Sequence, residues 1–366
     1  MHPYLLLALR IITGLGGTVL VITTLSAAIR SFVLPRNEVV RLNVWVFIGI
    51  RSFFDAAAKL ANSYERRDRI MAHYAPVALV ALPVAWEALV GLGYTSLYWA
   101  LNEGSLWKCY NLSSSYLLTL GTTKTTHGIV AALGYSEATL GLLLLTLLLS
   151  YLPTIYQAFS RREVTVALLE LRAGTPPTAA TLLSWLNHDG SVQNDDQHWA
   201  EWERWFVEIE ESHTSLPILS FFRSPQPGRS WVTAGGLILD TAALLFAAVD
   251  GPQPQQAQIT FKAGCLALNR VYRFFDTKTS AEPTSLPPGD EKPDPGRLEF
   301  DQACQLLADK GLKIYEDRAA AWQQYRELRG RYAGAVQFLS RLLMAPGQAP
   351  AGSRSSGWPF WRSERA

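Results

Sequence analysis

Cysteine is scarce in this chain, and so are the motifs of the common enzyme classes. The three cysteines, Cys109, Cys265 and Cys304, form no Cys-x-x-Cys pair and no spacing typical of a metal site. A disulfide framework is therefore not expected, and no metal or other cofactor is predicted. The sequence also contains no nucleophile–base pair, no His-Glu-x-x-His, no phosphate-binding loop and no glycine-rich turn between a strand and a helix. We therefore predict that the chain is not an enzyme. The alternative of a membrane enzyme would be supported if a soluble cytoplasmic fragment of the chain bound a nucleotide.

A strong charge imbalance is lacking as well. The 366 residues carry a formal net charge of only +2, so composition gives no reason to expect a nucleic-acid partner. The N-terminus has neither a basic stretch nor a small-residue cleavage site around a short apolar core, which predicts a retained first helix rather than a cleaved signal peptide. The length suggests about two domains.

Long uncharged runs are what the first 160 residues do contain. Ile11–Ile29 has nineteen residues without a charge, enough to cross the roughly 30 Å of hydrocarbon in a bilayer. Ile70–Leu101 is predicted to be a second span, bent by Pro76 and Pro83. Ala138–Ser160, with 23 uncharged residues, is predicted to be the third. Beyond it, charged and apolar residues alternate at helical spacing, which predicts a soluble half.

The first two runs contain residues that could have a functional or a structural role. Gly14, Gly16 and Gly17 lie in the first run, where small residues favour close packing between helices rather than a phosphate loop. Glu87 is the only charge of the second span and lies near its middle. An intramembrane carboxylate is a candidate functional residue, and the alternative is a structural hydrogen bond to a neighbouring helix.

The distribution of basic residues predicts the topology. From Arg30 to Arg69 there are eight Lys or Arg residues, whereas Asn102–Val130 has only Lys108 and Lys124. The positive-inside rule therefore puts the first connection in the cytoplasm and the second outside. Three spans then leave the N-terminus outside and most of the chain inside.

Val39–Arg67, in the first connection, is predicted to be one amphipathic helix. Its apolar residues can share one face, while Arg51, Asp55 and Lys59 share another at intervals of four residues. One interpretation is an interfacial helix that lies on the inner leaflet. The other is a helix packed against the soluble domain.

In the soluble half, an amphipathic helix with an aromatic stripe is predicted, because apolar residues recur there at helical spacing: Trp199, Trp202, Trp205, Phe206 and Ile209. Trp231–Val249 is ambiguous, because it is largely apolar and long enough to span. Asp240 at its centre, two glycines and the absence of a flanking basic cluster favour a helix buried in a cytoplasmic bundle. The domains expected from these patterns are as follows: 1–69, first transmembrane helix and interfacial helix; 70–160, pore unit; 161–276, cytoplasmic helical domain; 277–296, flexible linker; 297–345, two C-terminal helices; and 346–366, a tail predicted to be disordered. The two C-terminal helices are expected to be divided near Gly311 or in the region Tyr315–Ala319.

The segment between the second and third spans has the pattern of a re-entrant pore loop. Ser105–Asn111 is expected to be the outer connection, and Leu112–Leu118 a short pore helix. A turn at Gly121 and an extended return would follow, ending before the third span. Non-helical backbone is tolerated at membrane depth only where it is buried in protein or lines a water-filled path. There its carbonyl oxygens and Thr hydroxyl oxygens can replace an ion's hydration shell. The predicted constriction consists of Thr119, Leu120, Gly121, Thr122, Thr123 and Lys124.

These residues resemble the pore unit of the voltage-gated-like cation channel superfamily. Thr119-Leu-Gly121 occupies the place of the Thr-x-Gly that begins the selectivity filter, and Gly141 that of the hinge glycine of the inner helix. Up to about Phe275 the chain is similar to a bacterial group of ion channel or two-pore-domain potassium channel family proteins. The segments that carry this wider similarity are Ser31–Arg36, Tyr151–Tyr156, Phe159–Glu163, Arg172–Pro177 and Phe222–Ser224.

The sequence departs from the potassium-channel pattern Thr-Val-Gly-Tyr-Gly-Asp, which argues against potassium selectivity. Gly121 is followed by Thr122-Thr123-Lys124, so the second filter glycine is missing and a lysine replaces the acid. In a tetramer, lysines about 8 Å apart repel by roughly 2 kcal/mol per pair at an effective dielectric constant of about 20. Three outcomes stay open: lower cation flux, neutralisation by Glu103 or Glu137, and a preference for anions.

The resemblance implies an all-α membrane protein with a re-entrant pore loop and an α-helical cytoplasmic domain, located in the bacterial inner membrane. The implied partners are three further copies of the chain, which complete a homotetramer, the lipid bilayer and monovalent cations as permeating ions. Gly141 and Pro153 are the expected gating hinges of the inner helix. The alternative hypothesis is a non-conducting membrane scaffold or sensor that retains the channel fold.

Overall fold

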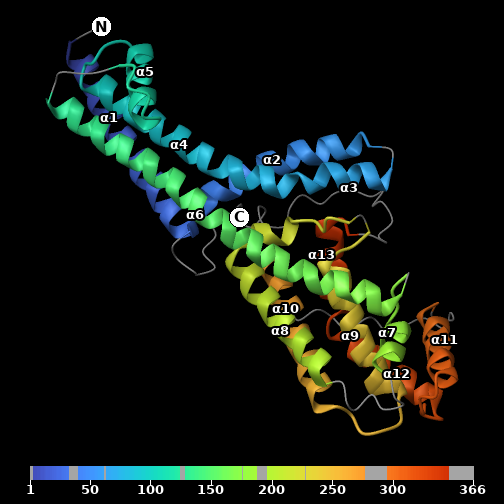
Figure 1. Ribbon diagram of the computed structural model, residues 1–366. Coiled ribbons are helices and arrows are strands. Elements are labelled where there is room, and N and C mark those ends of the chain that lie inside the picture. Colours follow the sequence, from blue (N-terminus) through green and yellow to red (C-terminus); the bar gives the residue numbers. More distant parts are fainter. Residues whose placement is uncertain are drawn as a thin grey trace. The chain divides into compact units, whose positions relative to one another are not determined.

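Helices form the regular structure of this protein in its computed structural model (Figure 1). The structure describes residues 3–32, 40–61, 63–123, 128–174, 176–187, 196–226, 228–276 and 295–345. Within these ranges the only β-type pairing is an isolated antiparallel bridge between Val249 and Ile314. The predicted all-α class is confirmed.

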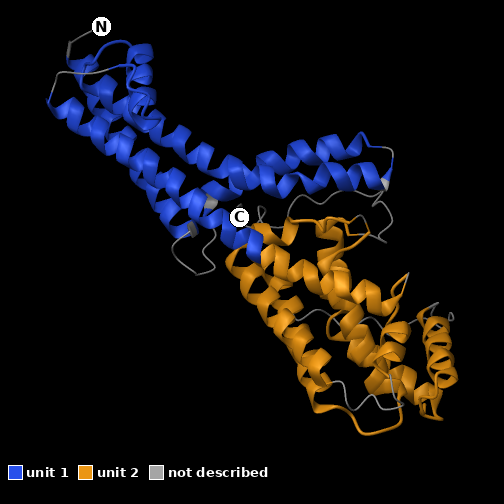
Figure 2. Ribbon diagram, viewed as in Figure 1, with its two compact units in different colours: residues 1–157 blue, residues 158–366 orange. Residues whose placement is uncertain are grey.

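The chain forms two compact units, residues 1–157 and 158–366 (Figure 2). The first unit contains α1 (Pro3–Phe32), α2 (Arg41–Lys59), α3 (Tyr64–Ala72), α4 (Tyr74–Ala100), α5 (Leu106–Leu117) and most of α6 (Gly128–Ala173). The second contains the end of α6, α7 (Ala179–Leu186), α8 (Asp196–Ser215), the 3-10 turn η2 (Pro217–Phe221), α9 (Trp231–Ala248), α10 (Gln255–Phe275), α11 (Pro295–Asp309), α12 (Arg318–Gly330) and α13 (Ala333–Leu343).

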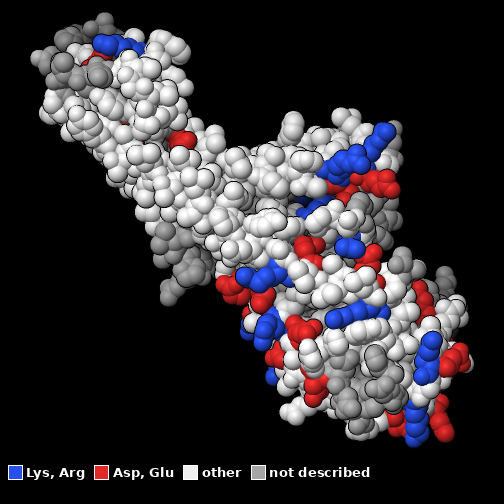
Figure 3. All heavy atoms as spheres, viewed as in Figure 1, with Lys and Arg blue, Asp and Glu red and all other residues white. Residues whose placement is uncertain are grey.

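Within the described residues, four helical segments are long and apolar enough to cross a membrane. They are Tyr4–Ser31, Glu65–Ala100, Gly128–Ala173 and Trp231–Ala248. The first and third contain the predicted spans Ile11–Ile29 and Ala138–Ser160, and the second contains the predicted span Ile70–Leu101 except for Leu101. The fourth is the ambiguous segment around Asp240. In Figure 3 the surface of the long apolar helices of the first unit is almost free of charged side chains, whereas charges of both signs cover the second unit.

Glycines bring α1 and α4 together, as expected for small residues in an apolar run. A Cβ added at Gly17 would lie 2.6 Å from the carbonyl oxygen of Gly93, and one at Gly14 would lie 3.1 Å from the Cβ of Ala100. Gly16 points into open space. The close approach of the two backbones therefore depends on Gly14 and Gly17 and not on Gly16.

The prediction of one helix over Val39–Arg67 is wrong, because the chain breaks after Lys59 and starts again at Tyr64. Ser63 caps the new helix by accepting a hydrogen bond from the backbone N–H of Arg66, which favours a helix start there. Helices α2 and α3 lie side by side (Figure 1). The predicted polar face is also partly wrong: Arg51 is buried, pairs with Asp55 at 2.8 Å and lies over the ring of Tyr74 of α4.

The second unit is a helical bundle built around α9. Fourteen positions of α9 are buried, and α7, α10, α12 and α13 pack against it. The aromatic stripe predicted on α8 supplies much of the core through Trp199, Trp202 and Phe206, all fully or almost fully buried. Gly264 of α10 leaves room for Phe206 at the crossing of α8 and α10, where a Cβ would lie 2.7 Å from its ring.

The end of the chain contains three helices where the sequence predicted two. The predicted break near Gly311 is present, since Gly311 has a φ of +86° after α11. A second break separates α12 from α13 at Arg331 and Tyr332. Most of the predicted linker, 277–294, and the predicted tail, 346–366, lie outside the described residues.

Candidate functional site: the turn after α5

Helix α5 begins earlier than expected, so the prediction of a pore helix limited to Leu112–Leu118 is wrong in its start. Ser105 caps the helix by accepting a hydrogen bond from the backbone N–H of Lys108, and the segment predicted as an outer connection forms its first turns. The helix ends at Leu117, close to the predicted end.

Directly after α5 the backbone turns through two left-handed positions. Thr119 has a φ of +54° and Gly121 a φ of +68°. Glycine adopts this conformation at no steric cost, but for other residues it costs on the order of 1–3 kcal/mol. A strained threonine persists only where its surroundings hold it, and such residues cluster at functional sites.

The chain then runs back along α5. The backbone N–H of Leu120 donates to the carbonyl of Ser115 at 2.9 Å, and that of Thr123 donates to the Ser115 hydroxyl at 3.1 Å. The Thr123 hydroxyl reaches one turn further, to the carbonyl of Asn111 at 3.2 Å. Residues 120–123 have no helical or strand structure. The predicted constriction residues Thr119 to Thr123 therefore share one turn; Lys124 lies outside the described residues.

Glycines on two neighbouring helices receive the end of α5. A Cβ at Gly141 of α6 would overlap the carbonyl oxygen of Leu117, and one at Gly134 would lie 2.5 Å from the ring of Tyr116. On α4, a Cβ at Gly91 would lie 3.3 Å from the Leu117 side chain. At Gly141 only glycine allows the backbone of α5 to come this close, whereas a Cβ at Gly134 or Gly91 would crowd side chains of α5. Helices α4 and α6 are therefore shaped around α5.

The positions of these contacts show how far α5 runs alongside its neighbours. Gly91 lies nine residues before the end of α4, and Gly141 lies thirteen residues after the start of α6. At 1.5 Å per residue these separations are about 14 Å and about 20 Å. The turn after α5 therefore lies well within the length of two apolar helices and not at their ends.

A carboxylate predicted only as a candidate neutralising partner of Lys124 is bonded to the helix that precedes this turn. Glu137 of α6 is completely buried. It accepts a hydrogen bond from the Tyr98 hydroxyl of α4 at 2.7 Å and is hydrogen-bonded to the Ser113 hydroxyl of α5. The Ser113 hydroxyl also lies 3.0 Å from the carbonyl of Gly91. Glu137 thus joins all three helices that surround the turn.

The other candidate residues are Glu87, Gly141 and Pro153. Glu87 is half-buried on α4, one residue after the fully buried Trp86. Helix α6 continues without a break through Gly141 and Pro153. The packing of Gly141 against α5 gives that residue a role besides the predicted hinge, which stays a prediction, as does hinge motion at Pro153.

A periodic pattern could have identified the contact face of α6. In its first seventeen residues, those that the structure buries are spaced by four and three: Val130, Gly134, Glu137, Gly141 and Leu144. This spacing marks one narrow face of a helix. Two glycines and an acid on the face that packs against protein would have singled out Glu137 ahead of Glu87.

The second unit holds a buried polar cluster at the start of its core. The Arg162 guanidinium donates to the carbonyl oxygens of Leu219 and Phe222 at 3.0 and 2.7 Å and lies 3.2 Å from Nε2 of His213. Because arginine only donates, Nε2 of His213 is the acceptor and carries no proton. Burial, and then the Arg162 charge, hold the pKa of His213 well below its usual value. No group of His, Cys, Asp and Glu suited to a metal occurs in the described parts of the chain.

Comparison with known proteins gives no family assignment. The chain matches no family model, no curated protein and no solved structure.

Proposed function

We propose that the chain is one subunit of a tetrameric, potassium-channel-like ion channel in the bacterial inner membrane. The observation that supports this most directly is the turn after α5. A short helix lies between two apolar helices, the backbone turns through two left-handed residues, and a segment without helical or strand structure runs back along the short helix, bonded to Ser115 and Asn111. This is the arrangement that a re-entrant pore loop requires.

Fourfold assembly is part of the proposal, because one loop per chain cannot enclose an axis. Leu120, Gly121 and Thr122 are exposed in the single chain, so their backbone carbonyls are available to face three neighbouring copies. The outer faces of α1 and α6 are likewise apolar and exposed, which suits contact with lipid or with further copies. Monovalent cations are the proposed permeating ions.

The proposed topology has three spans, with the second unit in the cytoplasm. The basic residues between α1 and α4 support an inner first connection. The fourth apolar helix, α9, is not assigned as a span because neighbouring helices already cover it. The second unit would then transmit a signal to the pore or hold the subunits together.

A matched pair of alanine substitutions tests the proposal, because the two glycines that are replaced have the same backbone conformation. Gly121 and Gly174 have φ values of +68° and +79°, and neither would meet another atom if a Cβ were added. Alanine should strain both by about 1 kcal/mol. We expect Gly121→Ala to change ion flux in proteoliposomes severalfold and Gly174→Ala, in the second unit, to leave it unchanged. Equal flux in both variants would count against a filter at residues 119–123.

Subunit number is the independent test. Particles in nanodiscs should show four copies arranged around an axis lined by the turn after α5. A monomer, or copies that do not meet along α6, would exclude the channel hypothesis.

The second candidate function, a non-conducting scaffold or sensor, is favoured by one observation. The filter-like segment lacks its second glycine and has Lys124 in place of an acid. Flux measurements on the wild type and on Lys124→Asp separate the two candidates. Two silent proteins that still assemble as tetramers would support the scaffold, and flux gained by the variant would support a channel limited by Lys124.

A further inference from the structure

The hydroxyl group of Ser113 has more hydrogen-bond acceptors around it than it has protons to donate. The Ser113 hydroxyl has one proton but lies within hydrogen-bond distance of two acceptors, the carbonyl of Gly91 and the carboxyl group of Glu137. It can donate to only one of them. The other contact needs a proton from elsewhere, and the single group there that can carry an additional proton is Glu137 itself.

The neighbouring groups do not favour a negative charge. From α4, Tyr98 donates to Glu137 at 2.7 Å, while Tyr94 pairs with Ser136, whose own hydroxyl donates to the carbonyl of Leu133. From α5, Tyr116 packs against Gly134. Among the described residues, the hydrogen-bond partners of Glu137 are two hydroxyl groups, and no Lys or Arg forms an ion pair with it.

We propose that Glu137 positions α5 as a neutral carboxylic acid. One carboxyl oxygen carries the proton and donates it to the oxygen of Ser113, and Ser113 donates its own proton to the carbonyl of Gly91. The other carboxyl oxygen accepts from Tyr98. Each polar group in the chain Tyr98–Glu137–Ser113–Gly91 then has a partner, and α6, α5 and α4 are joined through one proton.

The ionised form satisfies fewer groups. Ser113 must then turn its proton toward Glu137, so Gly91 loses the bond from Ser113. An anion would also remain buried without a positive partner among the described residues, which is strongly unfavourable in an apolar interior. Loss of the proton should therefore weaken the attachment of α5 to α4, next to the turn at residues 119–123.

Infrared spectroscopy of the full chain in nanodiscs tests this assignment directly. At neutral pH we expect a carbonyl band of a protonated carboxyl group that is absent from Glu137→Gln and retained in Glu87→Gln, the matched acid on α4. A neutral-pH spectrum in which Glu137→Gln loses no such band would overturn the proposal.

Substitutions at the same network add a second measurement. The amide of Glu137→Gln can still donate to Ser113 and accept from Tyr98, so we expect thermal stability at neutral pH close to that of the wild type. Glu137→Ala and Ser113→Ala should both lower the midpoint, while Ser114→Ala, at the half-buried neighbouring position, should not. Equal losses in Glu137→Gln and Glu137→Ala would show that the carboxylate acts as an anion and would overturn the proposal.

The inference deepens the proposed channel function and rests on it only for its effect on flux. The two can fail separately. The expected infrared band in a protein that carries no flux would count against the channel and support the neutral acid. Flux without the band would support the channel and overturn the neutral acid.

Discussion

Helices α1 and α9 are both apolar enough and long enough to span a membrane, yet they lie in opposite surroundings. In the apolar 18-residue stretch of α1, only 11% of the residues are buried by the rest of the protein, compared with 78% in α9. In α1 the side chains of Leu15, Val19 and Ile22 are exposed. In α9 the corresponding surface is covered by helices of the same unit. Apolar composition therefore shows that a helix must leave water, but not what replaces the water.

The polar residues of α9 explain why it suits a protein core. Asp240 accepts a hydrogen bond from Tyr332 at 2.5 Å and pairs with Arg329 at 2.8 Å. A Cβ added at Gly235 would lie 3.4 Å from the ring of Phe206, and one added at Gly236 would lie 3.3 Å from the side chain of Val336. The features that argued against a span in the sequence are thus contacts with neighbouring helices, which lipid could not provide.

The largest expected difference concerns matched leucines. Leu239 of α9 is fully buried, whereas Leu149 of α6 is 62% exposed. Leu239→Ala should lower the free energy of unfolding by about 2–5 kcal/mol, because it leaves a cavity among packed side chains. Leu149→Ala should change it by about 0.5 kcal/mol or less, because lipid can refill the space. Thermal unfolding in nanodiscs measures both, and similar losses would refute the contrast between the two units.

The next largest effect concerns glycines of the first unit. Gly141→Ala forces α6 away from the carbonyl of Leu117 and should cost about 1–3 kcal/mol. Gly16→Ala adds a methyl group in open space and should be neutral or stabilising by up to about 1 kcal/mol. The unfolding midpoints of the two variants measure the difference. A tolerated Gly141→Ala would mean that α5 and α6 are not in contact in the folded protein.

Acid should act on the second unit through His213. Its pKa is held well below the usual value by burial, so the folded unit excludes a proton that the unfolded chain binds. Stability is therefore complete above about pH 6.5 and falls as pH decreases below it, by up to about 1.4 kcal/mol per pH unit. Unfolding followed by tryptophan fluorescence should show this slope, and His213→Gln should flatten it. An unchanged slope in the variant would assign the acid sensitivity to another group.

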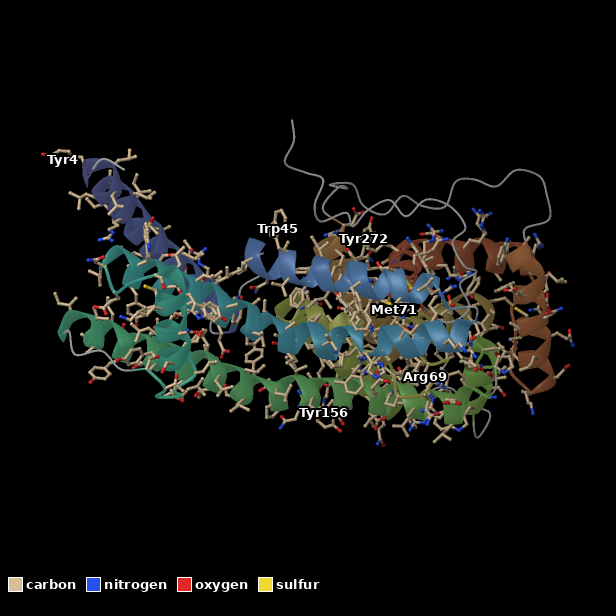
Figure 4. All side chains as sticks on the ribbon, turned by 90° about the horizontal axis from the view of Figure 1, so that it is seen from above. Tyr4, Trp45, Arg69, Met71, Tyr156 and Tyr272 are labelled. Atoms are coloured by element: carbon tan, nitrogen blue, oxygen red, sulfur yellow. The ribbon has the colours of Figure 1, made fainter. Side chains whose placement is uncertain are left out.

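The smallest effect on stability is expected at the outward face of α2. Trp45 is 72% exposed and points away from the helix (Figure 4), while Arg51 on the opposite face is buried. If α2 lies on the inner leaflet, Trp45→Phe should lose part of the fluorescence that brominated lipids quench, with a change in stability of about 0.5 kcal/mol or less. Trp202→Phe, in the core of the second unit, should lose none of it. Quenching that is unchanged by Trp45→Phe would favour the alternative, a helix packed against protein.

The parts of the fold that could be predicted depend on local signals. The apolar runs, the aromatic stripe of α8 and the break at Gly311 follow from composition and periodicity, and the structure contains each of them. The errors occur where a cap decides the boundary. Ser63 and Ser105 each accept a hydrogen bond from the third residue beyond, and each starts a helix that the apolar pattern alone did not indicate.

The candidate site was only partly predictable for a different reason. Thr119 and Gly121 were identified from their order along the chain, because the turn they form is local. Glu137 was not identified, because its importance depends on Tyr98 and Ser113, which belong to two other helices. A carboxylate at the edge of an apolar run has the same sequence signature whether water or protein surrounds it.

The sequence by itself determined that this chain is helical, that several of its helices must avoid water, and that the backbone turns after Leu117. These properties follow from spacing, capping and glycine, which act within a few residues. Only the tertiary structure decided which helices cover α9, that Arg51 faces inward and that Glu137 joins three helices. Burial is a property of neighbours, and the neighbours come from distant parts of the chain.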